Sequence, residues 1–126
     1  MNQKKTATSK RAPRPRSATY TQTFNKAWER YYRAGRQDLN KAVEVMQIIF
    51  ANKTIPPEYL DHALSGNEWN GARELHIGGD FLLVYSVDDQ SGLVTFIDLG
   101  THSELLDERG LSILTRLAHH TIPITQ

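Results

Sequence analysis

The spacing of apolar residues predicts a helical first half of the chain. A half-buried helix is indicated where apolar side chains recur at the i, i+3, i+4 and i+7 positions, namely Phe24, Ala27, Trp28 and Tyr31. Thr21 or Thr23 is placed to cap its first turn, and Gly35 is placed to end it. Both helix boundaries are therefore predicted from local chemistry alone.

A second helix is predicted directly after the first. Asp38 is a good N-cap, and one apolar stripe follows it, formed by Leu39, Ala42, Val43, Met46, Ile49 and Phe50. The Pro56-Pro57 pair stops anything helical. Because only residues 35–37 separate the two helices, we expect them to pack antiparallel as a hairpin.

The second half of the chain changes to strand-like patterning. Three short runs are rich in β-branched and aromatic residues, namely Arg73–Ile77, Phe81–Val87 and Leu93–Leu99. Turn-forming residues separate them, which favours an antiparallel meander. A first strand is predicted at 18–21, a helical turn at 103–106 and a C-terminal helix along Leu111, Leu114, Leu117 and Ala118. The pattern predicts an α+β fold with the hairpin on one sheet face and the other face free for a site.

Charge divides the chain differently from hydrophobicity. The segment 1–17 has no acidic residue and six basic ones, Lys4, Lys5, Lys10, Arg11, Arg14 and Arg16. The rest of the chain carries nine basic and fourteen acidic side chains. We expect a disordered basic arm at 1–17, a folded domain at 18–107 and a helical extension at 108–126. The arm either attracts a polyanion or serves only as a solubilising tail.

Several classes of protein are disfavoured by composition. The chain has no cysteine, so disulfide scaffolds, thiol catalysis and cysteine-based metal sites are excluded. Its longest apolar run, at 81–85, is too short to span a membrane, and no apolar segment typical of a secretory signal follows the N-terminal charges. We therefore expect a cytoplasmic location. The histidines include no HxH or HxxxH pair, so we expect neither a metal nor another cofactor.

Histidines are the candidate chemical groups, because imidazole gives or takes a proton near neutral pH. His62 lies in an irregular stretch, His76 ends a predicted strand with Asp80 across the following turn, and His102 follows the last strand. Since strand ends of a meander meet at one edge, we expect these groups to share a cleft. The remaining two, at 119 and 120, lie in the tail, where we expect exposure to solvent.

The order of these residues resembles a known family. The string runs Asp61-His62-x-Leu64-x-Gly66, then Arg73-x-x-His76-x-x-x-Asp80-Phe81-Leu82-Leu83-x-Tyr85, then Gly100-Thr101-His102-Ser103-Glu104-Leu105. It resembles the RelE/ParE toxin superfamily, and within it the YafQ-like branch of bacterial mRNA interferases. The resemblance covers about residues 20–106 and implies the RelE-like microbial RNase fold.

The resemblance implies a toxin of a type II toxin–antitoxin pair that enters the ribosome and cuts mRNA there, without a metal or cofactor. The partners implied are a cognate antitoxin, in a possible hetero-oligomer, the ribosome and mRNA. The residues in the family's catalytic places are His62, His76, Asp80 and His102. Arg73 is assigned to phosphate contact and Phe81, where the branch tends to have Trp, to base stacking. For the arm, contacts with rRNA are expected from Lys10, Arg11, Arg14 and Arg16.

Two positions depart from the branch. Asp98 stands where the branch has an arginine that steadies charge on the phosphate, and Leu106 stands where it tends to have an aromatic residue. Asp98 either orients a histidine or marks a toxin of weakened or altered activity. The alternative hypothesis is a non-catalytic protein on the same scaffold, which binds a gyrase-type target or an antitoxin.

Overall fold

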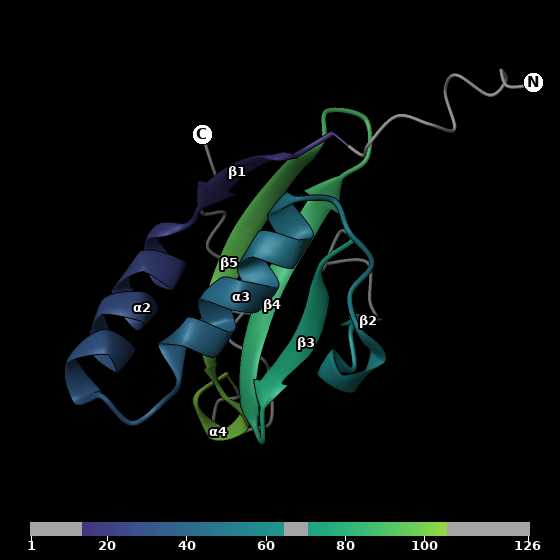
Figure 1. The fold of residues 1–126 in the computed structure, drawn as a ribbon. Helices are drawn as coiled ribbons and strands as arrows, with labels where there is room; N and C mark the ends of the chain where they lie inside the picture. Colours follow the sequence, from purple (N-terminus) through teal and green to yellow (C-terminus); the bar gives the residue numbers. More distant parts are fainter. Residues whose placement is uncertain (1–13, 65–70, 106–126) are drawn as a thin grey trace, which may run out of the picture.

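The computed structural model describes residues 14–64 and 71–105. These residues form an α+β fold in which helices cover a five-stranded sheet of order β1-β5-β4-β3-β2, as Figure 1 shows. The fold class predicted from the sequence is confirmed. None of the helices in the described part is long and apolar enough to cross a membrane.

Helix α2, Gln22–Ala34, begins and ends where its local chemistry predicts. The hydroxyl of Thr21 accepts a hydrogen bond from the Phe24 backbone N–H at 2.9 Å and donates one to the Ile97 carbonyl at 2.6 Å. The first contact caps the helix and the second ties it to the sheet. Gly35 ends the helix with a left-handed φ of 68°, a conformation that glycine adopts without strain.

Helix α3, Leu39–Phe50, is capped by Asp38 as predicted, and the face it turns to the core includes Leu39, Ala42, Met46 and Ile49 of the predicted stripe. Its buried residues are Ala42, Val45 and Ile49. The predicted stripe was wrong at two positions, because Val43 and Phe50 are 37% and 41% exposed. Tertiary packing sets the rotation of the helix, and it turns this pair away from the core toward a groove beside α2.

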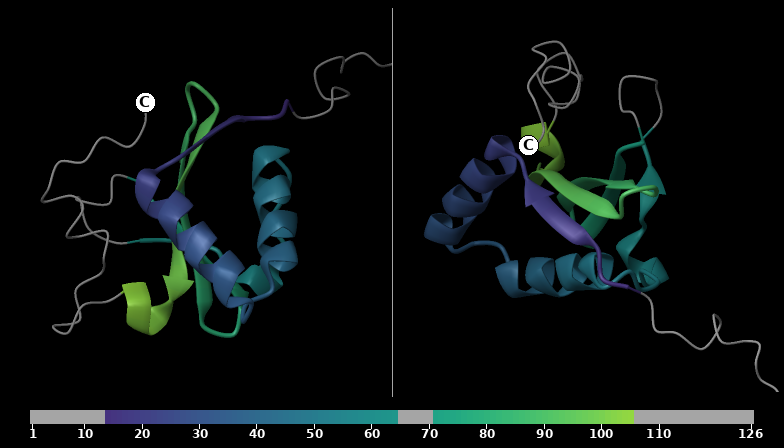
Figure 2. Two further views of the ribbon diagram at one scale, coloured as in Figure 1. Left: turned by 90° about the vertical axis from the view of Figure 1, so that its left-hand side faces the viewer. Right: turned by 90° about the horizontal axis from the view of Figure 1, so that it is seen from above.

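The two helices do not form the closely packed hairpin that their short connection predicts. Helix α2 packs chiefly against β5 and α3 against β3, and they diverge from their connecting turn (Figure 2). An apolar groove of about 500 Å³ lies between them, lined by residues that include Tyr20, Trp28, Val43, Met46 and Phe50. The sheet therefore holds each helix separately.

The sheet combines the predicted meander with two short outer strands. Its members are β1 (Ser17–Tyr20), β2 (His62–Ala63), β3 (Arg73–Gly78), β4 (Phe81–Asp88) and β5 (Leu93–Thr101). Strands β3, β4 and β5 pair antiparallel in sequence order, as expected. Strand β1 pairs parallel to β5, and β2 pairs antiparallel to β3 at the opposite edge. A 3₁₀ turn, Pro57–Tyr59, leads into β2, and helix α4, His102–Leu105, follows β5.

The two faces of the sheet carry separate apolar clusters. The helix side holds the larger core, which includes Phe24, Tyr31, Ile49, Leu75, Phe81, Leu83, Tyr85, Phe96 and Leu99. The opposite face holds a smaller cluster, Ala72, Leu82, Val84, Ile97 and Leu105, with Leu64 packed against it. The helix side of the sheet thus buries more apolar side chains than the opposite face, which also has room for the polar side chains of a site.

The chain termini are described only in part. Arg16 and Ser17 were expected to belong to a disordered arm, yet Ser17 starts β1 and the Arg16 guanidinium donates to the Ile49 carbonyl at 2.7 Å. A cation at the carboxyl end of a helix is favourable, so this contact anchors the base of the arm to α3. The remainder of the arm before residue 14 and the predicted helix after 105 lie outside the described residues.

Candidate active site

Strand register places His62 and His76 on the sheet face opposite α2 and α3. His62 is paired with Glu74, Glu74 with Val84, and Val84 with Asp98, so these four form one row across the sheet. The next row runs through His76, Leu82 and Gly100. Because directly opposed residues share a face, the imidazoles of both rows project beside the smaller apolar cluster.

The three histidines expected to share a site lie together. The ring centroids of His62 and His76 are 6.4 Å apart, and those of His76 and His102 are 5.7 Å apart. The rings come from β2, β3 and the start of α4, which are distant in sequence. His76 is the member that lies near both of the other rings.

Each imidazole is held differently. The Nδ1 of His62 lies 2.9 Å from the Leu60 carbonyl oxygen, and its Nε2 lies 3.3 Å from a carboxylate oxygen of Glu74. The carbonyl oxygen can only accept, so the first contact is a hydrogen bond when Nδ1 carries a proton, and the second is an ion pair when the ring carries two protons. The Nδ1 of His76 lies 3.3 Å from the Gly79 carbonyl oxygen. When that nitrogen donates, the Nε2 of neutral His76 keeps a lone pair for accepting a proton.

His102 is placed by the tight junction between β5 and α4. Its backbone N–H donates to the carbonyl of Asp80 at 3.2 Å, which ties α4 to the β3–β4 turn. A Cβ at Gly100 would lie 3.2 Å from Glu104 Oε1 and 3.3 Å from Leu105 Cδ2. Glycine at this position therefore lets α4 fold back closely on the strand and present the imidazole beside His76.

Asp80 lies at the same end of the sheet as these rings. It is exposed in the turn before β4, and its backbone carbonyl makes the contact with His102. Its carboxylate makes no hydrogen bond or ion pair with another described residue in this structure. Within the described ranges, 14–64 and 71–105, no group of three or more histidine and acidic side chains has the arrangement of a metal site.

Asp98 completes the first cross-strand row but is buried. The residue is 4% exposed, and its Oδ1 accepts from the Leu99 backbone N–H at 2.8 Å. Burial raises the pKa of its carboxyl to about 6, against smaller lowering effects of the Leu99 hydrogen bond and the Arg30 charge. A cavity of about 240 Å³ beside it is lined by residues that include Lys26, Arg30 and Glu104.

Arg73 and Phe81 lie on the helix side, away from the imidazoles. The Arg73 guanidinium binds Asp61, with Nε and a terminal nitrogen 3.0 Å and 2.8 Å from Oδ2. This hydrogen bond raises the pKa of the guanidinium further. Phe81 is 2% exposed and packs edge-on against Tyr31, with ring centroids 4.9 Å apart. The contact of Arg73 with phosphate and the stacking of Phe81 on a base stay predictions. In this structure Arg73 binds Asp61 and Phe81 packs against Tyr31.

The RNA contacts predicted for the arm are described only at its base. Arg14 is exposed, and Arg16 is engaged by α3 as described above. Lys10, Arg11 and, at the other end of the chain, Leu106 lie outside the described residues.

Sequence reasoning gave no role to three residues of the site region, Glu74, Asp61 and Tyr85. Glu74 contacts His62, and Asp61 joins Arg73 to Tyr85 on the other face. Glu74 was within reach of prediction, because alternation along a strand puts it on the same face as His76, two residues later. The Asp61 contacts were not, since they depend on how the irregular segment before β2 returns to the sheet.

Comparisons with known proteins show which family the chain resembles. Residues 16–107 match the family model described as a bacterial toxin of type II toxin-antitoxin system, YafQ. The mRNA interferase toxin YafQ of Escherichia coli K12 is 36% identical over 70 residues, which are 55% of this chain and 73% of the relative. The putative toxin YafQ of Haemophilus influenzae is 34% identical over 67 residues, 52% of this chain and 65% of the relative.

Solved structures give the same result at the level of the fold. The E. coli DinJ–YafQ complex contains a chain that matches with a TM-score of 0.66 and 30% identity, covering 73% of this chain and 99% of that one. A metal-bound toxin from Helicobacter pylori matches with a TM-score of 0.64 and 28% identity, covering 72% and 99%. Sequence and architecture thus point to the same group of proteins.

Proposed function

The chain belongs to the YafQ family of bacterial toxins of type II toxin–antitoxin systems, and on that basis we propose that it is an mRNA endoribonuclease that stops translation. The observation that carries the proposal is the group of three imidazoles with centroid spacings of 6.4 Å and 5.7 Å on one sheet face. Groups that exchange protons near neutral pH, placed at this spacing, are suited to the two ends of a scissile phosphodiester.

The proposed reaction needs no metal. The ribose 2′-OH attacks the adjacent phosphorus, the bond to the 5′-oxygen breaks, and the products carry a 2′,3′-cyclic phosphate and a 5′-hydroxyl. A base takes the proton from the 2′-OH, and an acid gives one to the departing 5′-oxygen. Each such group is typically worth ~10²–10⁴ in rate.

The contacts of the rings suggest which group does which task. We assign the base to His76, because its Nδ1 faces a carbonyl and leaves Nε2 as an acceptor. We assign the acid to His102, which is exposed and lies next to His76. The doubly held His62 supplies positive charge near the phosphate, steadied by Glu74. Asp80, exposed at the same end, orients the substrate or a ring.

We propose that cleavage takes place in the cytoplasm, on the ribosome, and that the basic arm contributes to binding there. The six cations of segment 1–17 contrast with the acidic excess of the remaining chain, so attraction to rRNA falls to the arm. The E. coli YafQ structure contains the protein DinJ in complex with YafQ. By analogy we propose a cognate antitoxin as the partner that neutralises this chain, in a hetero-oligomer.

Induced expression followed by mapping of RNA ends tests the activity. The wild-type protein is expected to stop growth and to produce new mRNA ends within codons. The His76→Ala and His102→Ala variants should abolish these ends while remaining folded. His119→Ala, which removes a histidine outside the matched residues 16–107, is the control and should leave them unchanged. Continued translation and an absence of cuts with the wild-type protein would falsify the proposal.

A second function is favoured by one observation, the buried carboxylate of Asp98. The YafQ-like branch has an arginine there, and an acid at that place does not attract phosphate. A non-catalytic toxin that binds a gyrase-type target or an antitoxin would tolerate this exchange. In that case the His76→Ala and His102→Ala variants keep full toxicity, an outcome that the nuclease does not allow.

A further inference from the structure

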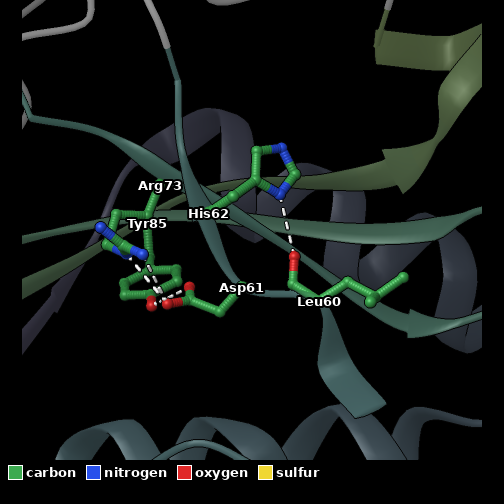
Figure 3. A network of polar contacts seen from close by, with 5 residues as sticks. All are labelled: Leu60, Asp61, His62, Arg73 and Tyr85. Carbon is green, nitrogen blue, oxygen red and sulfur yellow. Dashed lines mark hydrogen bonds and ion pairs between the residues drawn. The ribbon is translucent and has the colours of Figure 1, made fainter. Parts of the chain in front are cut away.

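Three residues of the sequence motif that take no part in the proposed proton transfers contact one another. Asp61, Arg73 and Tyr85 meet on the helix-side face of the sheet, while the neighbouring His62 projects in the other direction (Figure 3). We name these three side chains the Asp61 cluster.

The Asp61 carboxylate links two strands. Its Oδ2 accepts from the Arg73 Nε on β3 at 3.0 Å and forms an ion pair with a terminal guanidinium nitrogen at 2.8 Å, and its Oδ1 accepts from the Tyr85 hydroxyl on β4 at 2.5 Å. Arg73 and Tyr85 are directly opposed in the ladder, and Tyr85 is 2% exposed. Both oxygens of one half-buried carboxylate are therefore bound to a rigid part of the sheet.

The segment that carries this carboxylate runs from the buried Tyr59 into a very short strand. Strand β2 contains only two residues, whose partners in β3 are Glu74 and Arg73. Leu60, at the start of the segment, is exposed and has a left-handed φ of 53°, which is unfavourable for a side chain of its kind. A strained residue and a short edge strand hold their place only when their surroundings fix them.

The position of the His62 ring depends on the same segment. Its Nδ1 donates to the carbonyl of Leu60, which immediately precedes Asp61, and its Nε2 lies against Glu74. A shift of Asp61 moves both Leu60 and His62, because they are its chain neighbours. The carboxylate on one face of the sheet thus fixes the ring on the other.

We propose that the Asp61 cluster is a positioning device, which holds the Leu60–His62 segment so that the His62 imidazole stays beside Glu74 and His76. Arg73 acts here through Asp61 and not by touching RNA. The inference rests on the proposed function for its effect on cleavage, but the geometry that it predicts for His62 does not depend on RNA.

Two kinds of variant separate positioning from phosphate contact. Tyr85→Phe removes only the hydroxyl that binds Asp61. Arg73→Lys keeps the positive charge but loses the two-nitrogen contact with one carboxylate. A phosphate-binding residue tolerates lysine better than a positioning residue does. The control is Glu29→Gln, which breaks the exposed Arg33–Glu29 ion pair, 2.7 Å in length, on α2.

Cleavage kinetics provide the first measurement. Tyr85→Phe and Arg73→Lys should each lower kcat by about 10–100-fold, the effect of a misplaced catalytic group, with KM unchanged within about twofold. Glu29→Gln should change neither. A rise in KM with unchanged kcat for Arg73→Lys would mean that Arg73 binds RNA, and the proposal would be wrong.

Side-chain NMR of the histidines, without RNA, provides the second measurement. Proton–nitrogen spectra should show the His62 ring signals of the Tyr85→Phe variant shifted or broadened, with those of His102 in place. If wild-type protein cuts no RNA, the proposed function fails, and this spectrum still decides the inference. Unchanged His62 signals in a folded Tyr85→Phe variant overturn it. Should Arg73→Lys not fold, the milder Tyr85→Phe variant decides alone.

Discussion

Replacing Asp98 by asparagine removes a charge from the interior with almost no change of shape. The carboxyl is 4% exposed, and its one described hydrogen bond comes from the Leu99 backbone N–H. The amide oxygen of asparagine can accept that same bond. We therefore expect Asp98→Asn to retain the fold and to change the way in which stability depends on pH.

The size of the effect follows from the raised pKa. Burial moves the pKa of the Asp98 carboxyl from 3.8 to about 6, so the folded protein holds this proton more tightly than the unfolded chain does. Raising the pH from below 4 to above 6 therefore destabilises the folded state. At 1.36 kcal/mol for each pKa unit, the full loss is about 3 kcal/mol at neutral pH, of which ~0.5 kcal/mol is already present at pH 4.

Urea unfolding of both proteins at pH 4 and pH 8 measures this loss. The stability advantage of Asp98→Asn should grow by about 2 kcal/mol between the two values. Any cost of burying the amide adds equally at both pH values and cancels in the comparison. An advantage that is the same at pH 4 and pH 8 would refute the reasoning, because it would mean that Asp98 ionises as easily in the folded protein as in the unfolded chain.

Asp88 supplies a control of opposite sign. Backbone and side-chain hydrogen bonds from Gln90 and Ser91 lower the pKa of its exposed carboxyl. The folded state therefore favours the ionised form, and its contribution to stability is lost as the pH falls. Asp88→Asn should lower stability more at pH 8 than at pH 2, which lies below the ordinary pKa of 3.8, the reverse of the Asp98→Asn result.

Three further outcomes are expected from the structure. In Gly100→Ala the new Cβ would lie 3.3 Å from Leu105 and should displace α4. We expect a loss of about 1–3 kcal/mol in thermal unfolding, together with reduced cleavage. Undiminished cleavage would contradict the close packing of α4 on β5. Thr21→Ala loses both the helix cap and the bond to the Ile97 carbonyl and should cost about 1–2 kcal/mol in urea unfolding. Removal of residues 1–13 should weaken ribosome binding and make it less dependent on salt, as measured by co-sedimentation at several ionic strengths. Identical salt dependence with and without these residues would show that the arm does not bind the ribosome.

Local chemistry explains why some elements were predictable. The caps at Thr21, Gly35 and Asp38 act within a few residues of the chain, so they are legible in the sequence and are confirmed. The meander of β3, β4 and β5 was predictable for the same reason, because short turns force sequential strands to pair.

Features that depend on distant partners were not predictable. Strand β2 has two residues and no pattern of its own, and it exists because β3 offers a partner. The parallel pairing of β1 with β5 joins residues far apart in sequence. In α3, Val43 and Val45 are equally apolar, and only packing against the sheet decides that the second is buried.

The sequence allowed us to predict which histidines lie together, but not how every residue of the candidate site is oriented or buried. The proximity of the three imidazoles follows from strand ends that meet at one edge, as expected. The side on which Arg73 lies follows from strand alternation relative to His76, an odd number of residues away. The burial of Asp98 needs the whole fold, because it depends on what α2 and α4 cover.

The alternation of β3 limits how this protein can change over time. Arg73 and Leu75 face the helices, while Glu74 and His76 face the imidazole group. A substitution in this strand alters one face and leaves the other intact. Loss of a single codon would turn every following side chain of the strand to the wrong side, so that acid and imidazole enter the interior and leucine meets solvent. We therefore expect that β3 accepts amino-acid substitutions during evolution but does not accept an in-frame deletion of one residue.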